Sequence, residues 1–269
     1  MDFTKTATEI RKSIVEMIYH SQSGHPGGSL SAVDIVNYLY FKEMNVDPSA
    51  PDDTNRDRFV LSKGHAAPVL YATLAERGFF DKDLLPTLRK IGSILQGHPD
   101  AKKVPGVDVS TGSLGQGISN AVGLALGAKL DNSEARVYAL LGDGELQEGL
   151  VWEAAMAAAH YRLDNLVAIV DNNGLQIDGK NEEVINLGSI ADKFRAFDFN
   201  VIEIDGHNYD EIATAFAGAR ATIGKPTAII AKTVKGSGVS FMENQAGWHG
   251  IAPSKEQLDV AHAELGGVV

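Results

Sequence analysis

Two glycine-containing loops carry the side chains best suited to bind a metal ion and a phosphate group. The sequence GDG at 142–144 follows the apolar run 137–141, and DNNG at 171–174 follows the apolar run 166–170. Residues 145–171 have the length of one crossover helix and one strand, so a right-handed crossover would bring both loops to the same edge of a parallel sheet. Either loop alone is typical of an ordinary turn.

Three oxygen atoms in these loops form a candidate metal site. Asp143 offers a carboxylate, Asn173 an amide oxygen, and Leu175 a backbone carbonyl. This set suits Mg²⁺, which prefers oxygen ligands and takes the rest from water and substrate phosphates. The glycines allow backbone N–H groups to approach those phosphates. The two loops together therefore favour a metal–diphosphate site over two unrelated turns.

Histidine is the second signal, because four of the eight histidines lie next to glycine in loop-like contexts: His25, His65, His98 and His249. At the edge of a parallel sheet, such residues could converge as hydrogen-bond donors or proton carriers. Taken singly, each is more often structural or on the surface. No H-E-x-x-H spacing is present, which argues against zinc. We interpret the other four as structural or surface residues: His20, His160, His207 and His262.

Charged residues flank the same loops. Lys63 and Lys235 lie in the glycine-containing stretches SKGHA and VKGSG, where they could bind an anion or simply be solvated. Glu145 and Glu148 follow GDG, where acidic residues favour the start of a helix, although a carboxylate there could also carry a proton. The segment STGSLGQG at 110–117 lacks the G-x-G-x-x-G and G-K-[ST] patterns, which argues against a dinucleotide-binding fold and a P-loop. It could hold a flat group or form a tight turn.

Composition limits the classes of function. The chain has 269 residues, with 24 Lys and Arg against 35 Asp and Glu, and a formal net charge of -11. This charge disfavours nucleic acid and anionic membranes as partners. Cysteine is absent, which excludes disulfides, thiolate metal sites and a cysteine nucleophile. The N-terminal stretch has no unbroken apolar region, and no run of about 18 apolar residues occurs, so we expect a cytoplasmic protein.

Alternating strands and helices must position these loops. Amphipathic or alanine-rich patterns predict helices over 4–21, 31–42, 66–77, 116–130, 148–161 and 208–222. Apolar runs predict buried strands at 137–141, 166–170, 201–204 and 227–231. We therefore expect one α/β domain over 1–269 with a helical N-terminal region. It should have three layers: a mostly parallel sheet with helices on both faces and ligands at the carboxyl ends of the strands.

The motifs resemble those of one enzyme family. They are SGHPG at 23–27, DRFVLSKGHAAPVLYA at 57–72, QGHP at 96–99, TGSLGQG at 111–117, GDGELQEG at 142–149, DNNGLQIDG at 171–179 and WHG at 248–250. In this order they resemble the N-terminal, diphosphate-binding half of transketolase, from about residue 6 to 258. The resemblance implies a thiamine diphosphate-binding fold.

The resemblance also implies roles for particular residues. Asp143, Asn173 and the Leu175 carbonyl would hold Mg²⁺, or Ca²⁺ or Mn²⁺ in its place. The cofactor would contact Lys63, His65, Gly112, Ser113, Leu114, Gly142, Asp143, Gly144, Asn173, Ile177, Lys235 and His249. His25, His65, His98 and His249 would face the donor ketose and take part in catalysis. Glu148 would lie at a subunit interface and connect to the proton network of the cofactor.

The implied reaction is the transfer of a two-carbon ketol unit from a ketose, free or phosphorylated, to an aldose. A whole transketolase continues into a pyrimidine-binding domain that carries the activating glutamate, whereas this sequence stops at Val269. We therefore expect one subunit of a split transketolase, with a C-terminal partner subunit in an α₂β₂ complex. The alternatives are a subunit of a 1-deoxyxylulose-5-phosphate synthase-like transferase, or a non-catalytic scaffold. A metal-dependent hydrolase is disfavoured because the ligand spacing is missing.

Overall fold

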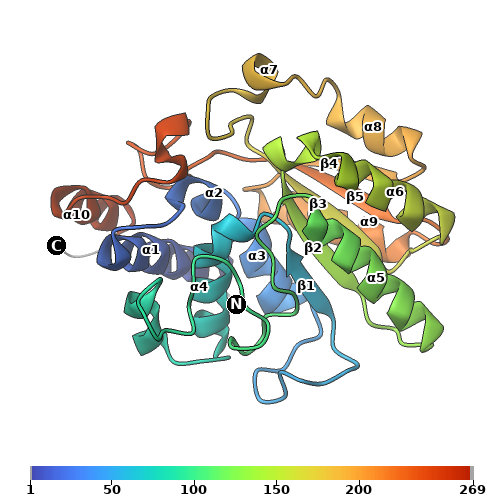
Figure 1. Cartoon of the computed structure of the whole chain (residues 1–269), viewed down its shortest axis with the longest axis horizontal. Coiled ribbons are helices and arrows are strands. Elements are labelled where there is room, and N and C mark those ends of the chain that lie inside the picture. Colours follow the sequence, from blue (N-terminus) through green and yellow to red (C-terminus); the bar gives the residue numbers. More distant parts are fainter. Residues whose placement is uncertain (1, 267–269) are drawn as a thin grey trace.

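A five-stranded parallel sheet forms the centre of the molecule (Figure 1). The computed structural model describes residues 2–266. The strand order is β1-β2-β3-β5-β4, and each neighbouring pair is parallel. The strands are β1 (Arg58–Leu61), β2 (Val137–Gly142), β3 (Leu166–Asn172), β4 (Asn200–Asp205) and β5 (Thr227–Lys232). All carboxyl ends therefore meet at one edge, which is where the sequence predicts the ligands.

Helices connect the strands and extend the chain on one side of the sheet. The α-helices are α1 (Phe3–Ser21), α2 (Pro26–Leu30), α3 (Val33–Tyr38), α4 (Ala67–Arg77), α5 (Gln116–Leu130), α6 (Gly149–His160), α7 (Asn181–Val184), α8 (Ile190–Ala196), α9 (Tyr209–Ala221) and α10 (Lys255–Glu264). A π-helical turn is η1 (Leu39–Glu43), and short 3₁₀ turns are η2 (Gly64–Ala66), η3 (Lys82–Thr87), η4 (Gly144–Gln147) and η5 (Ala246–His249).

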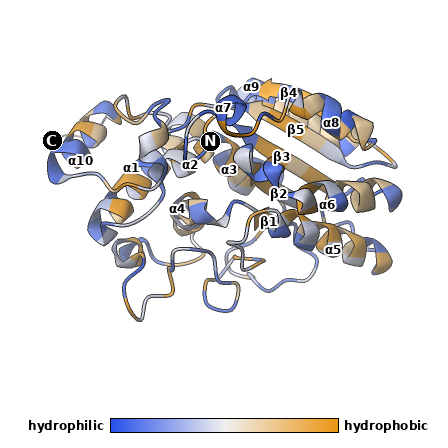
Figure 2. Cartoon of the chain, turned by 45° about the horizontal axis from the view of Figure 1, so that its top comes forward, coloured by the Kyte–Doolittle hydropathy of each residue, from blue (hydrophilic) through white to orange (hydrophobic). Residues whose placement is uncertain are grey.

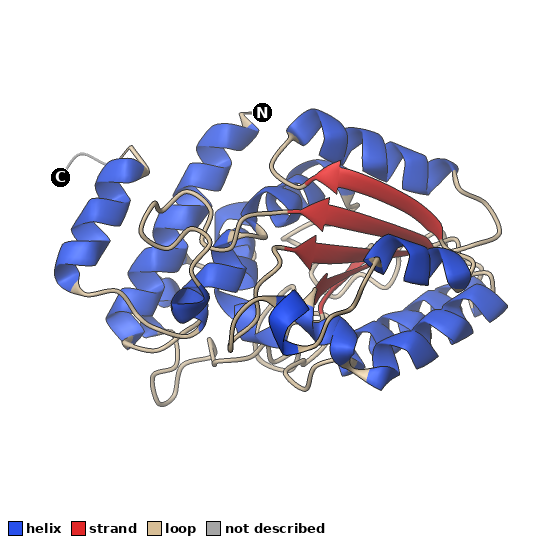
Figure 3. Ribbon diagram, turned by 90° about the horizontal axis from the view of Figure 1, so that it is seen from above, coloured by secondary structure: helices blue, strands red, loops and turns tan. Residues whose placement is uncertain are grey.

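Side chains alternate along the strands and divide the interior into two cores. In β2, Tyr138 and Leu140 pack with α3, α4 and α9, whereas Ala139 and Leu141 pack with α5, α6 and α8. This alternation follows from the two-residue period of a strand. Figure 3 shows the strands between the two groups of helices, and Figure 2 shows the apolar colouring concentrated in the sheet. The predicted three-layer α/β architecture is therefore confirmed.

The N-terminal region is helical, as predicted. The helix α1 packs against α3, α4 and α10, beside the sheet rather than on it (Figure 1). Asp2 caps α1 by accepting a hydrogen bond from the Lys5 N–H, and apolar residues such as Ile10, Ile14 and Ile18 form its buried stripe. The chain then passes through α2 and α3 before it enters β1. This order brings residues 23–34 alongside the carboxyl ends of the strands.

The observed elements differ from the predicted ones in several places, including the strand β1 and the short helix α2, which were not predicted. The strand β3 continues to Asn172, two residues past the predicted end, because Asp171 is buried and paired in the sheet. The predicted helix 31–42 is divided into α3 and the π-helical turn η1. The helices α7, α8 and α10 were not predicted.

No helix within residues 2–266 combines the length and the apolar character needed to cross a membrane. The single domain predicted over 1–269 stays a prediction, and its residues 1 and 267–269 lie outside the described residues.

Candidate functional site

A cavity of about 320 Å³ lies where the carboxyl ends of β2, β3 and β5 meet. It is lined by Gly28, Lys63, His65, Leu114, Gly142, Asp143, Gly144, Glu145, Gln147, Glu148, Asn173, Leu175, Gln176, Ile177, Lys235 and His249. Most of the residues predicted from the motifs are in this set. The exceptions are His25, His98, Gly112 and Ser113, which lie next to it.

Asp143 is the first residue after β2 and connects the two glycine loops. Its carboxylate accepts hydrogen bonds from the Gly144 N–H at 2.8 Å and from the Gly174 N–H at 2.5 Å. Gly174 has φ +78°, a conformation that glycine adopts without strain. Burial, together with the negative charge of Asp171, raises the pKa of Asp143 to about 6. The site therefore holds a desolvated carboxylate that a cation would stabilise.

Two further oxygens accompany Asp143 on the lining of this cavity. The amide oxygen of Asn173 accepts a hydrogen bond from the Leu175 N–H at 3.1 Å. The Leu175 carbonyl accepts one from Lys235 Nζ at the long distance of 3.3 Å. An all-oxygen set of this kind fits Mg²⁺. No cluster of three His, Cys, Asp or Glu side chains able to hold a metal occurs in residues 2–266, so a metal here would rest on one carboxylate, one amide and one carbonyl.

The cation of Lys63 is already compensated by Asp171. The Lys63 ammonium forms an ion pair with this carboxylate and donates to the Gly28 carbonyl at 2.7 Å. Asp171 also accepts hydrogen bonds from the hydroxyls of Ser31 and Thr233. Burial raises the pKa of Asp171, but the positive charge of Lys63 outweighs this effect and the pKa is lowered. Asp171 thus joins β3 to three other segments. The motifs did not predict this role.

Lys235 has no such compensation. Its side chain is only 1% exposed, and its Nζ contacts the Leu175 carbonyl and, at 3.0 Å, His249 Nδ1. The described residues place no carboxylate within ion-pair distance of it. Burial, with the charge of Lys63 next, lowers the pKa of Lys235 to about 8. A buried cation at the wall of the cavity would be stabilised by a bound anion.

Three of the four glycine-flanked histidines converge beside this lysine. The ring centroids of His25 and His65 are 5.1 Å apart, those of His65 and His249 are 5.1 Å apart, and those of His25 and His249 are 5.4 Å apart. Burial is the main cause that lowers their pKa values, to about 4 for His25, about 2 for His65 and about 3 for His249. The charges of neighbouring Lys and Arg side chains act in the same direction. All three imidazoles are therefore neutral at pH 7.

His98 lies in an adjoining cavity of about 310 Å³, together with Gly112 and Ser113. Its ring is so close to Gly112 that a Cβ at this position would be 3.0 Å from the imidazole. Burial and the charge of Arg89 lower the pKa of His98. The glycine segment 111–117 therefore separates two neighbouring cavities. A side chain at 112 would therefore require the His98 ring to move by a few tenths of an ångström.

Glu145 is a buried residue whose role the sequence did not indicate. Its carboxylate accepts hydrogen bonds from Ser62 Oγ at 2.5 Å, the Gly115 N–H at 2.9 Å and the Gly142 N–H at 3.0 Å. The sequence predicted a helix-start role or a proton-carrying role for Glu145, and neither includes these three contacts. Its neighbour Glu148 is exposed, and Ile177 is 63% exposed at the mouth of the cavity. An exposed apolar side chain there is available to a ligand or to a partner.

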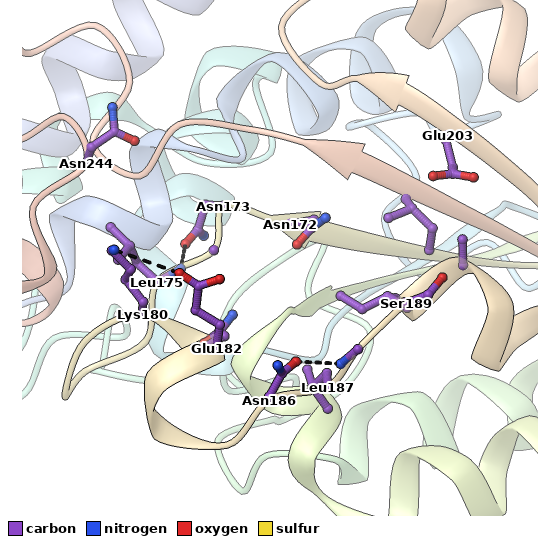
Figure 4. A pocket seen from close by; sticks show the side chains of 16 residues that line it. Asn172, Asn173, Leu175, Lys180, Glu182, Asn186, Leu187, Ser189, Glu203 and Asn244 are labelled. Atoms are coloured by element: carbon purple, nitrogen blue, oxygen red, sulfur yellow. Dashed lines mark hydrogen bonds and ion pairs between the residues drawn. The ribbon is translucent and has the colours of Figure 1, made fainter.

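A second cavity, of about 640 Å³, shares Asn173 and Leu175 with the first (Figure 4). Its other walls come from α7, the segment before α8, and the ends of β4 and β5. In Figure 4, Glu182 and Lys180 face one another beside Leu175, and Glu203 lies on the opposite wall. This cavity contains neither the histidines nor the lysines of the first. The candidate catalytic site is therefore the smaller cavity.

Comparisons with known proteins agree with this arrangement. Residues 3–267 match the model of the thiamine diphosphate-binding domain of transketolase. The chain is 47% identical to one of the subunits of the apulose-4-phosphate transketolase of Phocaeicola vulgatus, over 95% of this chain and 90% of that protein. It is 46% identical to the 6-deoxy-6-sulfo-D-fructose transketolase subunit SqwG of a Clostridium species, over 98% of this chain and 96% of that protein.

Full-length transketolases also match, but over only part of their length. The human enzyme is 46% identical over 97% of this chain and 41% of its own length. The structure of transketolase from Leishmania mexicana superposes with a TM-score of 0.94 at 35% identity, over 99% of this chain and 42% of that one. The present chain thus spans about two fifths of these enzymes.

The fold and the cavity define a thiamine diphosphate-binding α/β domain. The chain belongs to the transketolase family. The predicted relation to the N-terminal subunit of a split transketolase is confirmed, since two relatives of nearly the same length are named as transketolase subunits.

Proposed function

We propose that this chain binds thiamine diphosphate with Mg²⁺ in the 320 Å³ cavity and, with a partner chain, transfers a two-carbon ketol unit from a ketose to an aldose. The observation that carries the proposal is the arrangement of charges in that cavity. Lys235 is buried without a carboxylate partner, and Asp143 is a buried carboxylate with a raised pKa. A diphosphate with its metal ion supplies an anion for the first group and a cation for the second.

The residues present fit this cofactor. Asp143, the Asn173 amide oxygen and the Leu175 carbonyl would hold the metal ion, and Lys235 would contact the diphosphate. Gly142 and Gly144 have no side chains, which allows close approach of phosphate oxygens to the backbone. The cofactor supplies a thiazolium carbon that acts as the nucleophile toward the ketose carbonyl. Leu114 and Ile177 supply apolar contacts at the ring end of the cavity.

The neutral histidines suit the sugar end of the reaction. A neutral imidazole both donates and accepts hydrogen bonds, so His25, His65 and His249 can bind the hydroxyl and carbonyl oxygens of a ketose and move protons between them. His98 would reach the same substrate from the adjoining cavity. Because the imidazoles are buried and lie beside lysines, their lowered pKa values favour the neutral form.

A partner chain would complete the site. The cavity is open at Ile177 and Glu148, both of which are exposed. We expect a C-terminal subunit with a pyrimidine-binding domain to cover this opening and to supply the carboxylate that activates the cofactor. The partly exposed small side chains Ala157 and Ala159 of α6 would allow a close helix contact in an α₂β₂ complex. The cytoplasmic location expected from the sequence stays a prediction.

The proposal is tested by removing the metal-binding carboxylate. Asp143→Ala should abolish measurable binding of thiamine diphosphate in the presence of Mg²⁺, because the metal loses its only charged ligand. Titration calorimetry measures the affinity, and circular dichroism checks that the chain remains folded. The matched control is Asp178→Ala, which removes an exposed carboxylate that lies in the neighbouring loop after β3 and does not line the cavity. Unchanged affinity in Asp143→Ala would contradict the assignment.

A further inference from the structure

The position of the Lys235 ammonium group depends on the backbone of the loop that carries it. It belongs to the loop 233–237 that follows β5, and its long side chain has four rotatable bonds before the ammonium group. The loop contacts distant segments: the Gly236 N–H donates to the Gly27 carbonyl at 3.0 Å, and the Asn244 N–H donates to the Lys235 carbonyl at 2.9 Å. Desolvation drives a buried ammonium toward water unless the structure around it is fixed.

His207 holds the residue before this lysine. The Val234 N–H donates a hydrogen bond to His207 Nε2 at 3.0 Å. Because Nε2 accepts, the ring proton must be on Nδ1, which donates to Asp34 at 2.7 Å. The imidazole therefore bridges the loop and a carboxylate that is 173 positions away in the sequence.

Arg11 holds the other end of the same loop. Its Nε donates to the Ser237 carbonyl at 3.1 Å. Its two terminal nitrogens bind the Asp34 carboxylate at 3.2 and 2.6 Å. A guanidinium that binds a carboxylate through two nitrogens is fixed in both position and plane. The contacts on each side of Lys235 thus lead to one buried residue, Asp34 of α3.

Asp34 is itself firmly held. In addition to Arg11 and His207, it accepts a hydrogen bond from the Tyr209 hydroxyl at 3.0 Å. Its side chain is 7% exposed, whereas that of His207 is 23% exposed and faces a separate cavity that extends from β4 to β5. None of these residues lines the candidate cofactor cavity. They contact the loop 233–237 at Val234 and Ser237, and through this loop they can affect the cavity.

We propose that Asp34, Arg11 and His207 are positioning residues that set Lys235 against the diphosphate of the cofactor. The proposal rests on the proposed function for the identity of the anion. The position of Lys235 itself can be tested without any ligand. The three residues form a clamp on the loop 233–237, and the clamp keeps the ammonium group inside the cavity when no anion is bound.

The test compares two substitutions of the clamp histidine. His207→Leu removes both hydrogen bonds at similar volume, whereas His207→Gln retains an amide oxygen able to accept from the Val234 N–H. In the cofactor-free chain, acetic anhydride labelling followed by mass spectrometry should show Lys235 reacting several times faster in His207→Leu. Lys63, which keeps its ion pair with Asp171, serves as the internal standard. His207→Gln should return the rate of Lys235 toward that of the unsubstituted chain.

Cofactor affinity provides the second measurement. With Mg²⁺ present, the dissociation constant for thiamine diphosphate should rise roughly five- to tenfold in His207→Leu, the size expected for one well-placed interaction. The matched control is His20→Leu, the same change at an exposed histidine of α1, which should alter neither measurement.

A Lys235 labelling rate in His207→Leu equal to that of the unsubstituted chain would overturn the proposal, whether or not the affinity changed. Failure of the unsubstituted chain to bind thiamine diphosphate would instead contradict the proposed function. The labelling comparison would still show whether the clamp positions Lys235.

Discussion

The histidines of the cavity are chemically useful because they are uncharged. Burial and adjacent lysines lower the pKa values of His25, His65 and His249 to about 4 or below. A charged imidazolium would repel the ammonium of Lys235, which has no carboxylate within ion-pair distance among the described residues. Neutral rings can still form hydrogen bonds with a sugar, and His249, whose Nδ1 already accepts from Lys235 Nζ, keeps Nε2–H as a donor. Each neutral ring contributes little to the stability of the fold, because it is buried without forming an ion pair.

Alanine variants of His65, His98 and His249 should therefore lose activity rather than stability. We expect kcat to fall by roughly 10²–10³, the loss typical of one transition-state hydrogen bond. The assay requires the partner chain, and differential scanning calorimetry measures the melting temperature of each variant. If the variants melted early and kept their specific activity, the three residues would be structural.

Some site residues could be predicted from local sequence and others could not. Asp143 and Asn173 lie in glycine-containing loops that follow apolar runs, so their position at strand ends could be predicted. Asp171 lies two residues before Asn173 and was interpreted as part of a loop, whereas the structure places it inside β3. His207 and Asp34 acquire their roles from a contact across 173 positions, and no local periodicity signals such a contact.

At the scale of elements, the helices and strands near the site were predicted well because their patterns are strong. The glycine- and alanine-rich run 116–130 is α5, and the buried apolar runs form β2 to β5. The segment after GDG was predicted less well. It forms the 3₁₀ turn η4 before α6 begins, and this turn points Glu145 back toward the ends of β1 and β2.

Glu145 connects three elements, and its removal should destabilise the chain. Glu145→Ala leaves the Ser62 hydroxyl and the N–H groups of Gly115 and Gly142 without an acceptor. We expect a loss of about 2–3 kcal/mol in the free energy of unfolding, the cost of leaving buried donors unpaired. Urea denaturation followed by circular dichroism measures this loss.

Glu148→Ala is the matched control, because this exposed glutamate is three residues away in the same motif. Its free energy of unfolding should change by less than about 0.5 kcal/mol, as at other exposed sites. Equal stability of the two variants would refute the structural role of Glu145.

At the scale of the whole molecule, Asp34 connects α1 and α3 to the segment from the end of β4 to the start of α9. Burial raises its pKa, but the hydrogen bond from His207 and the charge of Arg11 more than offset this, so the pKa is lowered to about 2. A lowered folded-state pKa contributes stability that is fully present above the unfolded pKa of 3.8 and is lost as the pH falls toward 2. The contribution is about 2 kcal/mol.

The Asp34→Asn variant should therefore be less stable than the unsubstituted chain at pH 6 and should lose less stability on acidification from pH 4 to pH 2. Urea denaturation across this range, at fixed ionic strength, measures both slopes. Parallel slopes for the two proteins would show that Asp34 does not carry the acid sensitivity assigned to it.

The complex of this chain with its partner allows the most direct test of the proposed function. We propose that the chain supplies the parts of a transketolase site that bind the metal ion, the diphosphate and the sugar, and that a partner covers its cavity at Glu148 and Ile177. The decisive measurement is ketol transfer by the purified chain with thiamine diphosphate and Mg²⁺, before and after addition of the chain that carries the pyrimidine-binding domain. We predict no turnover before the addition, turnover after it, and none when Asp143→Ala replaces the unsubstituted chain. Full turnover by the isolated chain would contradict the proposal that a partner chain completes the site.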